Sequence, residues 1–212
     1  MFIQSELTPN PLTLKFLPGR VVMKEGTAFY QNESEDFLNL VHSKYELRDS
    51  YFKSVQSDAV DSDYSNGTII NSIFTDIGND AMDFSGSKSE LSEISIDGVG
   101  DKGISAGEMS KISGKHIDIL NAEIGITSKD LSEVNLSDVK IKDTRLGFAV
   151  FQKKEEYGAG KATITGLEMT NVDFIHLVDL NSTLTLNGID VISKRSKVSD
   201  LLYGANFGKS SK

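Results

Sequence analysis

A 22-residue repeat limits what this chain can fold into more than any other feature of its sequence. Three bursts of alternating apolar and polar residues fall within each period, and such alternation is typical of strands with one buried face. Small or polar residues separate the bursts, so each period predicts one turn of a parallel β-helix. The repeat shows best in a column of small residues, each followed by an apolar one: Ala59-Val60, Ala81-Met82, Gly103-Ile104, Gly125-Ile126 and Gly147-Phe148.

The repeat predicts an all-β solenoid of about six to seven 22-residue coils between residues 43 and 193. We expect the apolar column to form a ladder inside the solenoid. The small residues should sit where the chain bends tightly into the next strand and a larger side chain would clash. The register slips once, by about 7 residues near 151–160, which predicts a projecting loop.

A leucine-rich repeat is the rival interpretation, because "LSEISI" at 91–96 has the required leucine spacing. Leucine-rich repeats carry one strand per period and an Asn or Cys column, whereas this chain has several strand bursts and no such column. The sequence therefore favours the parallel β-helix.

Two short segments are predicted to cap the solenoid, whose open ends would otherwise expose strand edges. At residues 34–43 we expect a helix, with Ser34 as its N-cap followed by two acidic residues. A second cap is expected at 198–207, followed by a basic tail. Upstream, two short strands at 2–6 and 12–17 predict an N-terminal β-hairpin that belongs to the same cap.

Composition excludes several kinds of chemistry. The chain has no cysteine, so it cannot form a disulfide, a thiolate zinc site, a cysteine nucleophile or a cysteine-ligated iron–sulfur cluster of its own. Its net charge of -9, with dispersed acids, argues against a nucleic-acid partner. No segment resembles a signal peptide or a membrane span. If Met1 is the true start, these features predict a cytoplasmic protein without a membrane partner, although they do not exclude a surface or extracellular role.

An acidic corner is the candidate metal site. Asp58 and Asp61 precede Asp80 and Asp83 by one period, so stacking should bring their carboxylates together. Oxygens of adjacent coils could then share a Ca²⁺ ion, which would relieve their repulsion. The alternative is an ordinary hydrated turn, because Asp is common in turns.

Charged residues further along the chain are the candidate catalytic groups. They could stack as ion pairs that stabilise the solenoid, or line one face that binds a sugar chain and supplies acid, base and electrostatic stabilisation. Structural pairing is the favoured interpretation. The six candidates are Asp101, Lys102, Glu108, Lys129, Asp130 and Arg145.

The insertion "FQKKEEYGAG" at 151–160 is the most promising single locus for ligand binding, because insertions in solenoids usually project from one face. A loop without function is the alternative. The candidate ligand-binding residues are Gln152, Lys153, Lys154 and Tyr157.

Over about residues 43–193 the repeat resembles the right-handed parallel β-helix proteins of the pectin-lyase-like class. The resemblance implies a right-handed solenoid. Many members of that class bind, cleave or epimerise acidic polysaccharides, often with calcium, and others are structural surface proteins. The paired-aspartate, Gly-His-Gly and Arg-x-Lys signatures of polygalacturonase-like members do not occur together here, so the resemblance indicates the fold more specifically than the activity.

The first 30 residues are similar to a different family. "MFIQSELTPNPLTLKFLPGRVV", followed by "EGTAFY", resembles the opening of Nfu/NifU-type iron–sulfur scaffold proteins. That resemblance implies a partner-docking role in iron–sulfur assembly, but the cysteine-bearing domain of the family is absent.

These observations predict four segments: an Nfu-like head (1–30), a linker or capping helix (31–42), the β-helix (43–193), and a C-terminal cap with a basic tail (194–212). The leading functional hypothesis is a non-catalytic binding or structural module that contacts a glycan or protein surface. A polysaccharide lyase, hydrolase or epimerase is the first alternative, and an accessory factor in iron–sulfur assembly is the second.

Overall fold

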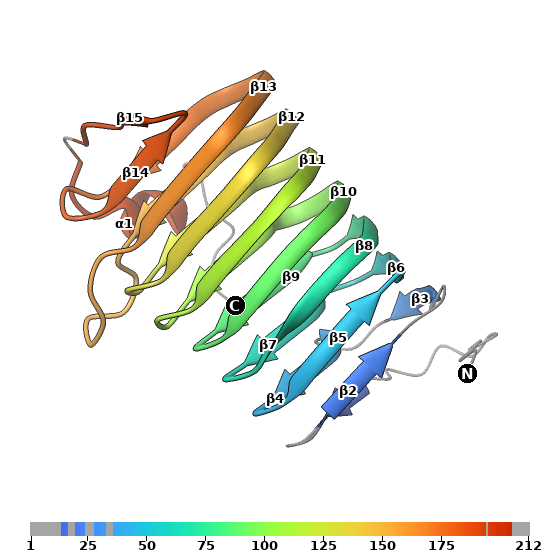
Figure 1. The fold of residues 1–212 in the computed structure, drawn as a ribbon. Helices are drawn as coiled ribbons and strands as arrows, with labels where there is room; N and C mark the ends of the chain where they lie inside the picture. Colours follow the sequence, from blue (N-terminus) through green and yellow to red (C-terminus); the bar gives the residue numbers. More distant parts are fainter. Residues whose placement is uncertain (1–13, 17–19, 24–27, 33–35, 194, 205–212) are drawn as a thin grey trace.

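Parallel strands, stacked coil upon coil, account for nearly all of the described chain (Figure 1). The computed structural model describes residues 14–16, 20–23, 28–32, 36–193 and 195–204. Its elements are β1 (Leu14–Phe16), β2 (Arg20–Met23), β3 (Ala28–Asn32), β4 (Asp36–Val41), β5 (Lys44–Arg48), β6 (Tyr51–Val55), β7 (Asp58–Asp63), β8 (Asn66–Ile77), β9 (Met82–Ser85), β10 (Lys88–Gly107), β11 (Lys111–Lys129), β12 (Glu133–Phe151), β13 (Lys161–Val178), β14 (Thr183–Leu186), β15 (Ile189–Asp190) and α1 (Val198–Leu202).

Each coil has three faces, and the strands from β1 to β14 pair in parallel with their equivalents one coil later, whereas β15 pairs antiparallel with β14. The first face contains β1, β4, β7 and β9, followed by the C-terminal parts of β10 to β13. The second face contains β2, β5 and the N-terminal part of β8, and the third contains β3, β6 and the C-terminal part of β8; β10 to β13 continue both. Strands β10 to β13 are long because they continue around the corners, with only short interruptions in their pairing, such as that between Val99 and Lys102. The prediction of an all-β parallel solenoid of about six to seven coils is confirmed.

The predicted apolar ladder forms the core. Val60 pairs with Met82, Ile104 with Ile126, and Ile126 with Phe148. All five residues of the column are at most 1% exposed. On the third face, the rings of Phe52 and Phe74 stack 4.8 Å apart. Removing this ladder from water is the main favourable contribution to folding.

The side chains of the small-residue column are small because the backbone of the neighbouring coil lies close to them. A Cβ on Gly103 or Gly125 would lie 2.8 Å from the carbonyl oxygen of the next glycine in the column. The predicted clash is therefore present. The tight bends themselves lie elsewhere, at three columns of residues with positive φ. They are His42, Tyr64, Gly86, Glu108 and Asp130; Asp49, Asn71, Glu93, His116, Asp138 and Gly166; and Ser54, Asp76, Gly98, Asn121, Asp143 and Asn171.

A buried serine ladder was not predicted. It runs along one corner, and each backbone N–H donates to the hydroxyl of the serine one coil later, at 2.8 to 3.1 Å. These hydroxyls satisfy donors that the turn removes from the strand ladders. The members are Ser43, Ser65, Ser87, Ser110 and Ser132.

The predicted N-terminal capping helix is wrong. Residues 36–41 form β4 and not a helix, because β1 and β7 pair with them on either side. In the described part of the head, β1, β2 and β3 pair in parallel with β4, β5 and β6 as an earlier coil, and the predicted hairpin between 2–6 and 12–17 is not tested. The predicted strand at 2–6 lies outside the described residues.

At the other end, a helix occurs as predicted, but it is short, spanning Val198–Leu202. The offset across the insertion is 28 residues, as in the pairing of Val139 with Leu167, so the loop adds six residues and not seven. No helix in the described part of the chain is long and apolar enough to cross a membrane.

Candidate functional site

Six charged residues form a ladder on the outer side of the first face. We call Asp58, Asp61, Asp80, Asp83, Lys102 and Lys129 the charged ladder. Stacking brings Asp58 and Asp80 together as predicted, because the Asp80 backbone N–H donates to Asp58 Oδ1 at 2.8 Å. Asp61 and Asp83 are directly paired between β7 and β9.

The two lysines neutralise one end of the charged ladder. Lys102 Nζ lies 3.3 Å from Asp80 Oδ1 and 2.5 Å from Asp101 Oδ2. Lys129 Nζ donates to Ser105 Oγ at 2.8 Å and lies 3.8 Å from Asp83 Oδ1. Both lysines are buried, so these contacts offset the cost of removing their ammonium groups from water.

The pKa values along the ladder follow this pairing. Burial, reinforced by the Asp80 charge, raises the pKa of Asp58 to about 8. Burial and the Asp63 charge likewise raise the pKa of Asp61 to about 8. Burial raises the pKa of Asp80 to about 6, with Lys102 opposing the shift. Burial also disfavours ionised Asp83, but Lys129 and Lys102 outweigh it and lower the pKa of that carboxyl group.

The four predicted calcium ligands thus lie next to one another, but their carboxyl groups have different partners. Asp80 is engaged by Lys102, whereas Asp58 and Asp61 face other carboxyl groups. Within the described ranges, no three His, Cys, Asp or Glu side chains are grouped so that they could hold a metal ion. The four-aspartate site stays a prediction.

The six candidate catalytic residues lie in three separate places. Asp101, Lys102 and Lys129 belong to or adjoin the charged ladder, and Arg145 is ion-paired with Glu123. Glu108 accepts hydrogen bonds from Tyr64 and Lys154 at another corner, near Asp130. The contacts of Lys102, Lys129 and Arg145 agree with structural pairing, the favoured interpretation, and a catalytic role for the six residues stays a prediction.

The insertion loop is held by its own polar groups. Asp130 Oδ1 accepts hydrogen bonds from the backbone N–H groups of Lys153 and Lys154 at 2.6 and 2.8 Å. The Gln152 side chain donates to carbonyl oxygens within the loop, including that of Tyr157 at 2.5 Å. Lys154 also pairs with Glu108, and Lys153 Nζ lies 4.7 Å from the centre of the Tyr203 ring. Three of the four proposed ligand-binding side chains, those of Gln152, Lys153 and Lys154, thus make contacts within the chain.

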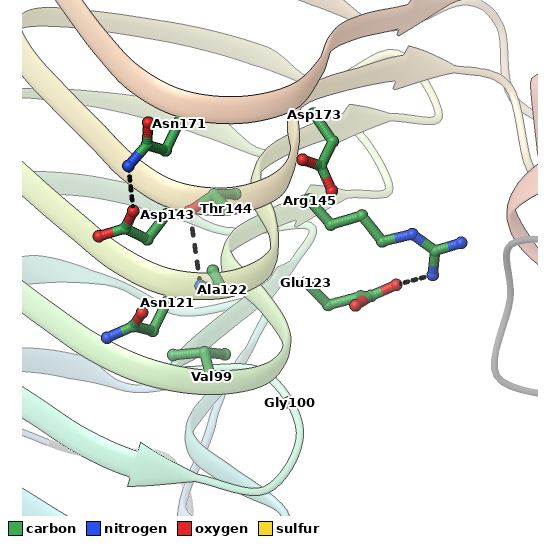
Figure 2. A pocket seen from close by; sticks show the side chains of 10 residues that line it. All are labelled: Val99, Gly100, Asn121, Ala122, Glu123, Asp143, Thr144, Arg145, Asn171 and Asp173. Atoms are coloured by element: carbon green, nitrogen blue, oxygen red, sulfur yellow. Dashed lines mark hydrogen bonds and ion pairs between the residues drawn. The ribbon is translucent and has the colours of Figure 1, made fainter.

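An open polar pocket of about 590 Å³ lies at the corner between the third and first faces (Figure 2). Four successive coils, from β10 to β13, contribute to it. Its lining residues are Val99, Gly100, Asn121, Ala122, Glu123, Asp143, Thr144, Arg145, Asn171 and Asp173.

The pocket has a buried floor and polar walls. Val99, Ala122 and Thr144 form the floor and are at most 5% exposed. One wall carries the corner amides, and Asn171 Nδ2 donates to Asp143 Oδ1 at 2.8 Å. The other wall carries Arg145, whose guanidinium donates to Glu123 (Figure 2).

Sequence reasoning identified only Arg145 among these pocket residues as a functional candidate. The missed signal was the column of Asn121, Asp143 and Asn171, which recurs at 22 and then 28 residues. All three have positive φ, a conformation that Asn and Asp tolerate better than most residues.

The C-terminal helix covers the apolar end of the first face, beyond the charged ladder. Val198 and Leu202 of α1 pack against Ile124, Leu146 and Phe151. The Val198 backbone N–H donates to Asp179 Oδ1 at 2.7 Å. The expected cap therefore covers the side of the solenoid.

Comparisons with solved structures show the fold. The catalytic domain of a GH87 α-1,3-glucanase in complex with nigerose is similar, with a TM-score of 0.51, 12% sequence identity, and coverage of 73% of this chain and 42% of that chain. A variant of such a domain in complex with tetrasaccharides has a TM-score of 0.39 and 11% identity, with coverage of 71% and 48%. This chain thus spans less than half the length of either structure. A search of curated proteins found no match.

Comparison with family models agrees with the architecture. The model described as "Right handed beta helix region" matches residues 37–199, which is more than half of the chain. The Nfu-like stretch at 1–30 lies outside this match, and its resemblance stays a prediction. The chain belongs to the right-handed β-helix family.

Proposed function

We propose that this chain is a glycan-binding β-helix module and that the pocket at the corner of β10 to β13 is its binding site. The observation that carries the proposal is the pocket itself, in which four successive coils present amide, carboxylate and guanidinium groups around a buried floor. Such groups complement sugar hydroxyls, because amides both donate and accept, carboxylates accept and guanidinium donates.

The repeat of the pocket walls suits an extended ligand. Equivalent residues on neighbouring coils are about 4.8 Å apart, the spacing of paired strands. A chain of sugar residues can therefore meet a new set of polar groups at each coil. Nigerose is bound by the GH87 domain, and it is a suitable first ligand to test with this chain.

Titration calorimetry against a panel of neutral, basic and acidic oligosaccharides tests the proposal. We expect at least one class to bind, and Arg145→Ala or Asn121→Ala to weaken binding by about tenfold or more, because each substitution removes polar contacts in the pocket.

Arg48→Ala is the matched control for this experiment. Arg48 also forms an ion pair, with Glu46, but it lies on the second face, away from the pocket. This variant should bind like the wild type. Binding that survives both pocket substitutions would place the glycan site elsewhere, and no binding by any class would refute the glycan proposal.

A polysaccharide-cleaving or epimerising enzyme is the alternative. The charged ladder favours it, because Asp58 and Asp83 combine a raised and a lowered pKa, and such divergent carboxyl groups are typical of acid–base pairs. Product analysis on the same panel separates the two functions. Turnover that Asp58→Asn abolishes would establish the enzyme.

A further inference from the structure

The amide side chains that line the pocket at the corner of β10 to β13 direct their donors at carboxylates of the protein. Asn121 Nδ2 donates to Asp97 Oδ1 at 2.8 Å, and Asn171 Nδ2 donates to Asp143 Oδ1 at 2.8 Å. An ionised carboxylate can only accept, so the nitrogen of each amide must face it. The oxygen of each amide is therefore the atom that remains for a ligand.

The other side-chain donors of the lining also have partners within the protein. The Thr144 hydroxyl donates to the carbonyl oxygen of Lys142 at 3.0 Å. The Arg145 guanidinium donates to Glu123 and so holds that carboxylate in the wall of the pocket (Figure 2). The side-chain groups left for a ligand are thus mainly acceptors, and a matching ligand has to supply the donors.

The charges around the pocket lead to the same conclusion. The lining contains three carboxylates and one guanidinium group, and Arg145 is paired with Glu123. Lys142 Nζ, at the surface, lies 3.6 Å from Asp143 Oδ2. The third carboxylate, that of Asp173, is exposed and forms no hydrogen bond or ion pair with any residue that the structure describes. One negative charge of the pocket is therefore left for a ligand to neutralise.

We propose that the ligand of this pocket is a basic glycan, built of amino sugars with free ammonium groups, and that Asp173 selects it. The inference rests on the proposed glycan function and names the class of glycan. An ammonium group carries three donors and a positive charge, so it can pair with Asp173. The sugar hydroxyls can donate to the amide oxygens of Asn121 and Asn171. An acidic sugar would instead bring a second carboxylate to Asp173, and like charges repel.

Two oligosaccharides that differ only at the amino group test this preference: the glucosamine tetramer and its fully N-acetylated form. Titration calorimetry of the full chain at about pH 6 keeps the carboxylates ionised and the sugar amines protonated. We expect the glucosamine tetramer to bind about tenfold more tightly than the acetylated tetramer. Asp173→Asn should remove most of this difference, because it takes away the carboxylate that pairs with the ammonium group.

Glu90→Gln is the matched control, because it removes one exposed carboxylate from the second face, away from the pocket. It should keep the preference, whereas non-specific attraction to a chain of net charge -9 would change equally in both variants. Equal affinity for the two tetramers, or a preference that survives Asp173→Asn, overturns the inference. If the acetylated tetramer still binds and Asn121→Ala weakens that binding, the proposed function stands and only the amino-sugar preference fails. If neither tetramer nor any other oligosaccharide of the panel binds, both proposals fail.

Discussion

Lys102 shows how a single residue keeps a buried carboxyl group in this solenoid. Its ammonium group bridges Asp80 and Asp101, and its backbone N–H donates to Asp80 Oδ1 at 3.0 Å. Burial opposes the charged form of Lys102, but the two carboxylates outweigh it and raise the pKa of the amine. The pair is therefore ionised inside the protein, where each partner depends on the other.

Replacing Lys102 with methionine should destabilise the fold. The substitution keeps most of the side-chain volume but leaves Asp80, which is 2% exposed, without its cation. We expect the free energy of unfolding in urea to fall by about 3 to 5 kcal/mol at neutral pH. Adding Asp80→Asn should restore part of the loss, because it removes the unpaired charge. A loss below about 1 kcal/mol would show that the pair contributes little.

At the scale of strands, the approach of neighbouring coils decides which side chains are allowed. In the small-residue column, Ala59 and Ala81 accommodate a Cβ, whereas a Cβ on Gly125 would lie 2.8 Å from the Gly147 oxygen. The carbonyl oxygen of the next coil therefore leaves no room for a Cβ at this glycine. The serine ladder acts at the same scale, because it satisfies backbone donors at one corner of four consecutive coils.

Gly125→Ala should push apart β11 and β12, which pair at this position, and so destabilise the fold. The added methyl group meets backbone, which cannot rotate away, so we expect a loss of about 1 to 3 kcal/mol by chemical denaturation. Ala81→Gly is the control in the same column, at a position that accommodates a methyl group. It should lower the free energy of unfolding by about 0.5 to 1 kcal/mol, because glycine gives the unfolded chain more conformational entropy. Equal losses for both substitutions would contradict the proposed clash.

At the scale of the whole molecule, the two neighbours of β13 differ in length. Strand β12 pairs along nearly all of β13, whereas β14 covers only Lys161 to Ile164. Asn187 partly replaces the missing strand, since its amide bonds both the N–H and the carbonyl of Leu167. Even so, Leu167 and Met169 are half-buried, while the equivalent Val139 and Ile141 are fully buried.

Hydrogen exchange should therefore be faster in the middle of β13 than in β11 and β12. In a solenoid each coil is stabilised by its neighbours, so a coil with one incomplete neighbour opens most easily. Exchange measured by mass spectrometry should show earlier deuterium uptake in peptides that cover 165–176 than in those that cover 139–150. Uniform protection across these peptides would contradict this prediction.

The sequence by itself determined the coil. Its 22-residue period reflects the stacking of strands, in which every coil repeats the same pattern of inward residues. The ladder from Val60 to Phe148 could therefore be predicted residue by residue. The same register predicted that Asp58 would meet Asp80. The helix expected at 34–43 failed because local propensity is overridden when strands on both sides offer pairing.

The tertiary structure decided which charges are compensated and where ligands can be reached. Lys102 and Lys129 reach from one coil to the carboxylates of another. These contacts depend on side-chain direction and burial, which a repeat does not encode. The pocket at β10 to β13 likewise arises from the shape of a corner. Stacking is periodic and can be read along the chain, whereas desolvation and charge pairing depend on everything that surrounds a residue in space.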